Sequence, residues 1–276
     1  PVKPVRIIVA SGPGSGDDFA TRVLANELST LLKQQFVVEN RPGAGGVIGQ
    51  TAVMKSPPDG YMLLLAGGSM AGARFVNAAV TYDVLKDFTP ISTVETSPFA
   101  LVASPALPAK DLKEFIAFAK SRPGKLSFGT IGAGQVPWWA VFLFNHMAGV
   151  NAVDITYKGT SEAMTDVMTG RLDYFVAPLV GALAAKDKLR VLAVTSAERS
   201  AMLPDVPSMA EAGLPGYDMP AWRSIMGPAG MPPEVVAILN KAIQQALASP
   251  DLRERYAKAG SVPLGSTPEG LRKRYE

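Results

Sequence analysis

Short runs of β-branched residues alternate with helix-like patterns along the first part of the chain. Strand-like runs stand at 5–9, 36–39 and 61–65, and helical patterns lie between them at 19–33 and 48–55. Such alternation is typical of an α/β fold, in which a helix connects successive parallel strands. The chain therefore predicts an α/β fold with mostly parallel sheets flanked by helices.

The alternation restarts in the middle of the chain. Strands are expected at 126–129, 153–157, 172–176 and 189–195, each separated from the next by a helical pattern or a loop. A second stretch of this kind indicates a second α/β unit.

Proline and glycine cluster at 104–108 and again at 215–228, where we expect the chain to cross between domains. The last part of the chain, about 50 residues, is short for a domain of its own, so we expect it to return to the first one. The prediction is a first domain of residues 1–103 plus 222–276, a second domain of residues 104–221, and a ligand cleft between them.

Composition argues against several classes of function. The 27 Lys and Arg residues exceed the 24 Asp and Glu residues by only three and stand singly, so we expect no nucleic-acid binding. No apolar run reaches the roughly 18 residues that a membrane-spanning helix needs. The chain begins at Pro1 without an initiator methionine, so a processed N-terminus is expected.

The sequence offers little material for catalysis or metal binding. It has no cysteine, which removes disulfides, thiol nucleophiles and cysteine-based zinc sites. Its one histidine, His146, lies in an apolar helical run without a visible partner, so a buried or helix-end position is expected rather than work as a base or ligand. Because no catalytic triad order or metal-ligand spacing is present either, we predict no catalytic residue, no metal and no cofactor.

A glycine-rich loop at 11–18 stands between the first expected strand and the first expected helix. Its backbone N–H groups can bind an anion at the helix N-terminus, and its glycines permit close approach. Asp17 or Asp18 can equally be a helix cap. The glycine spacing matches neither the dinucleotide-binding fingerprint nor the P-loop, so the loop does not indicate a phosphate.

Two further loops of small residues follow strands of the first domain. The loop at 39–49 is also glycine-rich, and Arg41 within it is expected to form a salt bridge. The loop at 66–69 offers N–H groups and the Ser69 hydroxyl at the carboxyl end of a strand, where α/β sheets bind ligands. These loops are expected to line one wall of the cleft.

The second domain supplies the expected opposite wall. A glycine-rich loop at 129–137 leads into two adjacent tryptophans, Trp138 and Trp139. Because neighbouring helix positions point about 100° apart, we expect one ring to enter the core and the other to face elsewhere. Lys158 and Arg223 are at least as readily solvated or salt-bridged as they are ligand contacts.

Several longer strings carry a family resemblance. They are Glu-Asn-Arg-Pro-Gly-Ala-Gly-Gly at 39–46, Pro-Asp-Gly-Tyr at 58–61, Thr-Tyr-Lys-Gly at 156–159, Leu-Pro-Asp-Val-Pro at 203–207 and Glu-Ala-Gly-Leu-Pro-Gly-Tyr at 211–217. With them the chain resembles, over essentially its whole length, the Bug family, the extracytoplasmic receptors of tripartite tricarboxylate transporters.

The resemblance implies a two-domain periplasmic binding protein of the Venus-flytrap type, exported by a signal peptide that is removed before Pro1. Members of the family capture small organic anions and deliver them to membrane subunits, and some inform a sensor kinase. A monomer is expected. In these receptors one carboxylate is held largely by backbone groups and ordered waters between two loops, which correspond here to 11–18 and 67–69.

The sequence departs from the family pattern at four positions of the expected site. Ser11 stands where the family usually has an aromatic residue, Ser15 where it has a second glycine, Asp17 where it has an uncharged residue, and Trp138 where it has a histidine. A smaller loop residue and an added indole ring favour a bulky or aromatic carboxylate, with Trp222 as a second wall. Alternatively, Trp138 is buried and the pocket is merely wetter. Asp17 repels a nearby carboxylate unless it points away or meets a cationic group of the ligand.

The expected ligand-binding residues lie at the ends of strands or in the segments that follow them. They are Ser11, Gly14, Ser15, Gly16, Asp17, Asp18, Gly67, Gly68, Ser69, Thr130, Ala133, Gly134, Trp138, Tyr157, Pro178 and Trp222. Two other functions stay open at this point. One is a small-molecule enzyme that uses Asp18 as its base, and the other is a ligand sensor of the same fold that serves no transporter.

Overall fold

The computed structural model describes all 276 residues, and the chain divides into two compact units. Unit 1 comprises Pro1–Thr96 and Trp222–Glu276, and unit 2 comprises Ser97–Ala221. The first crossing lies after Thr96 rather than after the expected residue 103, because strand β5 (Phe99–Ala103) pairs within the sheet of unit 2.

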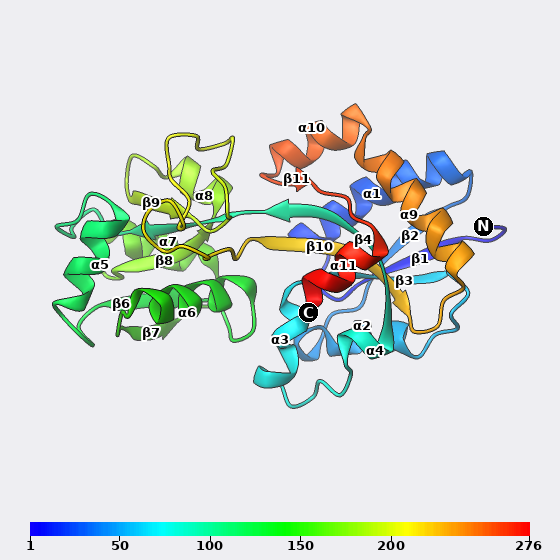
Figure 1. The fold of residues 1–276 in the computed structure, drawn as a ribbon, viewed down its shortest axis with the longest axis horizontal. Coiled ribbons are helices and arrows are strands. Elements are labelled where there is room, and N and C mark those ends of the chain that lie inside the picture. The colour runs from blue at the N-terminus through cyan, green and yellow to red at the C-terminus, as the bar shows by residue number, and fades with distance from the viewer. The chain divides into compact units, whose positions relative to one another are not determined.

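A six-stranded sheet forms the centre of unit 1 (Figure 1). β1 runs parallel to β2 and β3, whereas β10 is antiparallel to β3 and β11 to β4. The α/β class is confirmed, but the sheet is mixed rather than mostly parallel, because β10 enters it at the edge where β3 ends. In sheet order the strands are β11 (Val262–Pro263), β4 (Phe88–Ser97), β10 (Ala221–Pro228), β3 (Met62–Gly67), β1 (Val5–Val9) and β2 (Phe36–Asn40).

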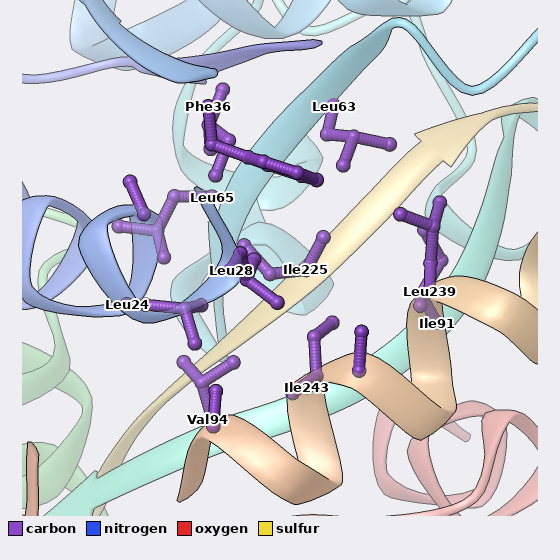
Figure 2. Packing of buried hydrophobic residues seen from close by; sticks show 14 of the residues in the cluster. Leu24, Leu28, Phe36, Leu63, Leu65, Ile91, Val94, Ile225, Leu239 and Ile243 are labelled. Atoms are coloured by element: carbon purple, nitrogen blue, oxygen red, sulfur yellow. The ribbon is translucent and has the colours of Figure 1, made fainter. Parts of the chain in front are cut away.

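Both faces of this sheet are buried. Ile7 and Ile8 of β1 are fully buried although adjacent strand residues point to opposite faces. On one face, Leu24 of α1 and Ile243 of α9 pack into the cluster that contains Ile7 (Figure 2). On the other, Ile8 belongs to a cluster with Met70 of α3. The helices of unit 1 are α1 (Gly16–Leu32), η1 (Ala44–Gly46), α2 (Val47–Met54), α3 (Ser69–Val76), α4 (Val84–Asp87), α9 (Pro233–Leu247), α10 (Pro250–Lys258) and α11 (Pro268–Tyr275).

Unit 2 has a five-stranded mixed sheet. Parallel pairs join β6 to β7 and to β8, and β5 is antiparallel to both β8 and β9. In sheet order the strands are β7 (Val153–Thr156), β6 (Ser127–Thr130), β8 (Tyr174–Pro178), β5 and β9 (Arg190–Val194), and the helices are α5 (Leu112–Lys120), α6 (Val136–Ala148), α7 (Thr160–Thr169) and α8 (Leu179–Ala184).

Aromatic rings fill the core of unit 2. The ring of Tyr174 in β8 lies 5.2 Å from that of Phe115 in α5 and 6.0 Å from that of Phe144 in α6, measured between centroids. The buried Tyr174 hydroxyl donates to Asn145 Oδ1 at 2.7 Å, which satisfies a polar group that would otherwise be costly to bury. The core therefore holds α5 and α6 in fixed positions on one face of the sheet.

Two expectations about single residues are confirmed. His146 is exposed in the last turn of α6, which is a helix-end position. Arg41 Nε donates to Glu39 Oε1 at 2.6 Å, which is the expected salt bridge. No helix of the structure combines the length and the apolar character that a membrane crossing requires.

Candidate functional site

The register of the first sheet brings three segments of unit 1 to one edge. β1 and β3 are parallel with Val9 opposite Leu65, so the loops that follow these two strands leave the sheet side by side. β10 begins at the same edge, with Arg223 opposite Gly67. The loop at 11–15, the segment at 67–69 and the first residues of β10 therefore gather where the sequence placed a ligand-binding wall.

The loop at 11–15 is closed by its own side chains. Ser15 is the N-cap of α1, and its hydroxyl accepts from the Asp18 N–H at 3.2 Å. The N–H of Gly14, a residue whose φ of +78° favours glycine, donates to Asp18 Oδ2 at 2.9 Å. The hydroxyls of Ser11 and Ser15 lie 2.8 Å apart and bond each other. The Gly14 N–H, which was expected to bind the ligand, therefore donates to the Asp18 carboxylate of the protein itself.

Asp18 is a structural residue of this loop. It is buried, Arg22 Nε donates to its Oδ2 at 3.0 Å, and Arg22 Nη2 lies at ion-pair distance, 2.9 Å, from its Oδ1. The hydrogen bond from Arg22 is the main cause that lowers the pKa of Asp18 to about 2, against an opposing effect of burial and with help from the Gly14 N–H. A carboxylate with so low a pKa is a poor general base near neutral pH.

Asp17 takes part in a second ion-pair group, which includes a residue that the sequence analysis missed. Arg223 Nε donates to Asp17 Oδ1 at 2.6 Å, and Arg223 Nη1 donates to Oε1 of Glu95 in β4. Glu95 is fully buried, whereas the Asp17 side chain is 43% exposed. An acidic residue in the otherwise apolar and hydroxyl-bearing run at 88–97 was the available signal for Glu95, since a buried carboxylate needs a cation.

The segment at 67–69 packs against an aromatic pair. A Cβ atom on Gly68 would lie 2.8 Å from Trp222 Nε1, so the indole ring rests directly on this backbone and requires a glycine there. The rings of Trp222 and Tyr275 meet edge to face at 4.8 Å, and the Tyr275 hydroxyl donates to the Gly67 carbonyl at 3.2 Å. Trp222 is half-buried and adjoins the start of α3 at Ser69.

In unit 2, the expected residues also follow the carboxyl ends of parallel strands. Thr130 ends β6 opposite Thr156 of β7, and Pro178 ends β8, the other neighbour of β6. Thr130 is buried, and its hydroxyl donates to Asp154 Oδ1 at 2.7 Å. Tyr157 is half-buried and donates to Asp166 Oδ2 at 3.0 Å; burial first, then this bond, raises its pKa to about 12. Both hydroxyls are therefore engaged within unit 2.

The expectation that one of the two adjacent tryptophans enters the core is wrong. Both rings are half-buried, because the core-facing side of α6 is occupied by other residues, including Ala140, Val141 and Phe144. The Trp138 ring lies 4.3 Å from that of Phe142 at an interplanar angle of 37° and meets Trp139 edge to face at 4.7 Å. These three rings form an aromatic surface beside the loop at 131–135, which holds Ala133 and Gly134.

The structure contains no group of three or more His, Cys, Asp or Glu side chains arranged to hold a metal ion. The three acidic residues described above in unit 1, Asp17, Asp18 and Glu95, are instead paired with arginines. The chemistry at the carboxyl edges of the two sheets is that of backbone N–H groups, hydroxyls, the partly exposed carboxylate of Asp17, the exposed carboxylate of Asp154, the exposed Lys158 ammonium and aromatic rings, which suits the binding of a small molecule.

Comparisons with known proteins agree on one family. The model of the tripartite tricarboxylate transporter family receptor, TctC, matches residues 20–269. Protein BugT of Bordetella pertussis is 37% identical over 276 residues, which cover 99% of this chain and 85% of BugT. Among solved structures, Rpa4515 of R. palustris with adipate has a TM-score of 0.82 and 30% identity, covering 100% of this chain and 93% of the other. MatC (Rpa3494) of Rhodopseudomonas palustris with bound malate has a TM-score of 0.80 and 30% identity, covering 100% and 96%.

Proposed function

Because the chain belongs to the family of tripartite tricarboxylate transporter receptors, as its motifs predict, we propose that it is a periplasmic receptor that captures a small organic carboxylate. It would deliver this ligand to the membrane subunits of such a transporter. The observation that carries the proposal is the gathering of the loop at 11–15, the segment at 67–69 and the start of β10 at one sheet edge. Relatives solved with adipate and with malate support the ligand class.

Within unit 1, we assign the ligand's carboxylate to the start of α3. The first N–H groups of any helix lack an intrahelical partner, and the dipole of the helix favours an anion there. In α3 these groups belong to Ser69 and Met70, beside the half-buried Trp222. The loop at 11–15 is less suited to an anion, because Asp18 already accepts from the Gly14 N–H.

We further propose that unit 2 contributes to the same ligand site and that the two crossings of the chain serve as a hinge. Its part is the segment at 130–138, in which α6 begins at Val136 and its N-cap residue, Gln135, makes no side-chain capping bond. Unsatisfied N–H groups at this helix start are available to a second polar group of the ligand. Ala133 and Gly134 bring the backbone close, since neither carries a bulky side chain.

The aromatic surface of Trp138, Trp139 and Phe142 supports a bulky or aromatic carboxylate. A half-buried ring can still bury apolar ligand surface or stack on a planar ligand. We expect Trp138→Ala to weaken benzoate binding by about 1–3 kcal/mol and cyclohexanecarboxylate binding by less. Calorimetric titration measures both acids with the wild-type protein and with Trp138→Ala. Equal losses for the two acids, or a preference for benzoate that survives in Trp138→Ala, would contradict stacking on Trp138.

The alternative of an enzyme with Asp18 as its base has less support. Asp18 is buried and ion-paired, and its pKa of about 2 leaves it almost no affinity for a proton at neutral pH. A sensor that serves no transporter would use the same site, so the gene neighbourhood of this chain decides between sensing and transport.

The test of the proposed function is a thermal-shift screen of the purified protein against adipate, malate, benzoate and neutral sugars, with mass spectrometry of the small molecules after incubation. A receptor raises its melting temperature with at least one acid and returns that acid unchanged. A shift with sugars alone, or the appearance of a product, would reject a carboxylate receptor.

A further inference from the structure

Arg223 forms ion pairs with two carboxylates of the protein. Its guanidinium lies between Asp17 and Glu95, and Glu95 is fully buried in β4. Removing the cation from a buried ion pair is strongly destabilising, because the carboxylate that remains has lost its counter-ion in a place where water cannot replace it. Arg223 is also tightly placed: a Cβ atom on Gly16 would lie 3.1 Å from its Nη2 atom. Arg223 therefore cannot be withdrawn to bind a ligand carboxylate.

Asp17 shares its counter-ion with a second carboxylate. Arg223 bonds both Asp17 and Glu95, whereas Asp18 is paired with Arg22. Asp18 and Glu95 are buried, but the Asp17 side chain is 43% exposed, so its negative charge faces the solvent. A ligand carboxylate near Asp17 would meet a like charge.

Asp17 also has unused capacity to accept hydrogen bonds. Its Oδ1 accepts from Arg223 and its Oδ2 accepts from the Ser11 hydroxyl at 3.2 Å. An ionised carboxylate offers about four acceptor positions, so roughly two stay available on the exposed side. Three hydrogen-bonding groups of the same loop, the Gly14 N–H and the Ser11 and Ser15 hydroxyls, bond groups within the loop.

We propose that Asp17 is a specificity-determining residue, which selects ligands that carry a cationic nitrogen as well as a carboxylate. This inference rests on the proposed function, since it concerns the same ligand site. The carboxylate is bound at the start of α3, and the protonated nitrogen forms an ion pair with Asp17. The loop at 11–18 thus recognises a cation, although the sequence predicted that it recognises an anion.

The experiment compares two pairs of acids that differ in an amine group, adipate with 2-aminoadipate and malate with aspartate. Calorimetric titration of the full chain measures each dissociation constant. We expect the amine-bearing acid of at least one pair to bind about fivefold tighter, the factor that a partly exposed ion pair supplies. Asp17→Asn keeps the shape and an oxygen acceptor for Arg223, and we expect it to abolish or reverse this preference.

Asp251→Asn is the matched control, because Asp251 is also an acidic residue in the first turn of a helix and pairs with Arg255 at 3.7 Å. It should leave the preference unchanged. If the acids bind with no preference for the amine, and Asp17→Asn leaves the ratio of dissociation constants within each pair unchanged, the role of Asp17 is rejected while the proposed function stands. If no acid of either pair binds to the wild-type protein or to Asp17→Asn, the receptor function for these acids fails and the inference fails with it. Binding of adipate or malate by Asp17→Asn alone would support repulsion by Asp17.

Discussion

The ion pair between Arg22 and Asp18 should stabilise unit 1 in a pH-dependent way, and Arg22→Gln tests this. The pKa of Asp18 is lowered from 3.8 to about 2, mainly by the hydrogen bond from Arg22, and the whole shift corresponds to about 2 kcal/mol by linkage. The Arg22 side chain is 51% exposed, so water screens the pair. We therefore expect Arg22→Gln to lower the free energy of unfolding at pH 7 by only about 1 kcal/mol.

The direction of the pH dependence follows from the lowered pKa of Asp18. A carboxyl group whose pKa is lower in the folded state contributes its full stabilisation above its unfolded pKa of 3.8 and loses it as the pH falls through the folded pKa, about 2. The difference between wild type and Arg22→Gln should accordingly be largest at neutral pH and shrink between pH values of about 4 and 2.

Urea unfolding at several pH values measures this difference. Trp222 is the one tryptophan of unit 1, so a background of Trp138→Phe and Trp139→Phe makes its fluorescence report on this unit. Arg6→Gln is the control, because Arg6 is 49% exposed and lies 3.6 Å from Glu39, and we expect it to cost less than about 0.5 kcal/mol. The reasoning is refuted if Arg22→Gln costs as much at pH 2 as at pH 7, or no more than Arg6→Gln at pH 7.

Two further predictions concern ligand binding. Gly68→Ala places a Cβ atom 2.8 Å from Trp222 Nε1, so we expect it to lower the free energy of unfolding by about 1–3 kcal/mol and to weaken ligand binding. Gly12→Ala is the control: its Cβ atom would have no heavy atom within 4 Å, so the melting temperature should not change. If the two crossings act as a hinge, the radius of gyration from small-angle X-ray scattering should fall when a bound acid is present, and an unchanged radius would argue against closure unless the unliganded protein is already closed.

The sequence predicted the parts of the fold that depend on local patterns. The alternation of apolar and helical segments identified β1, β2 and β3 with the helices between them, because each element has its own periodicity. The strands at the crossings were missed. β4 and β10 owe their places in the sheet to pairing with strands far along the chain, and a local residue pattern does not specify such pairing.

The candidate site was likewise predicted only in part. Its loops could be located from glycine and hydroxyl residues at strand ends, since chain order alone places them at one edge of the sheet. The partner of Asp17, however, is Arg223, 206 residues away, and Glu95 is 128 residues from Arg223. The two tryptophans were misjudged because other residues of α6 fill its core-facing side and leave room for neither ring.

The central claim is that backbone N–H groups at the start of α3 bind the ligand's carboxylate. Nuclear magnetic resonance of protein labelled with ¹⁵N at serine and methionine measures the amide signals of Ser69 and Met70 directly, with the tightest binder among adipate, malate, 2-aminoadipate and aspartate at saturation. The account predicts that both amides shift, while that of Ser249, before α10, does not. Binding that leaves the Ser69 and Met70 amides unmoved would contradict the claim.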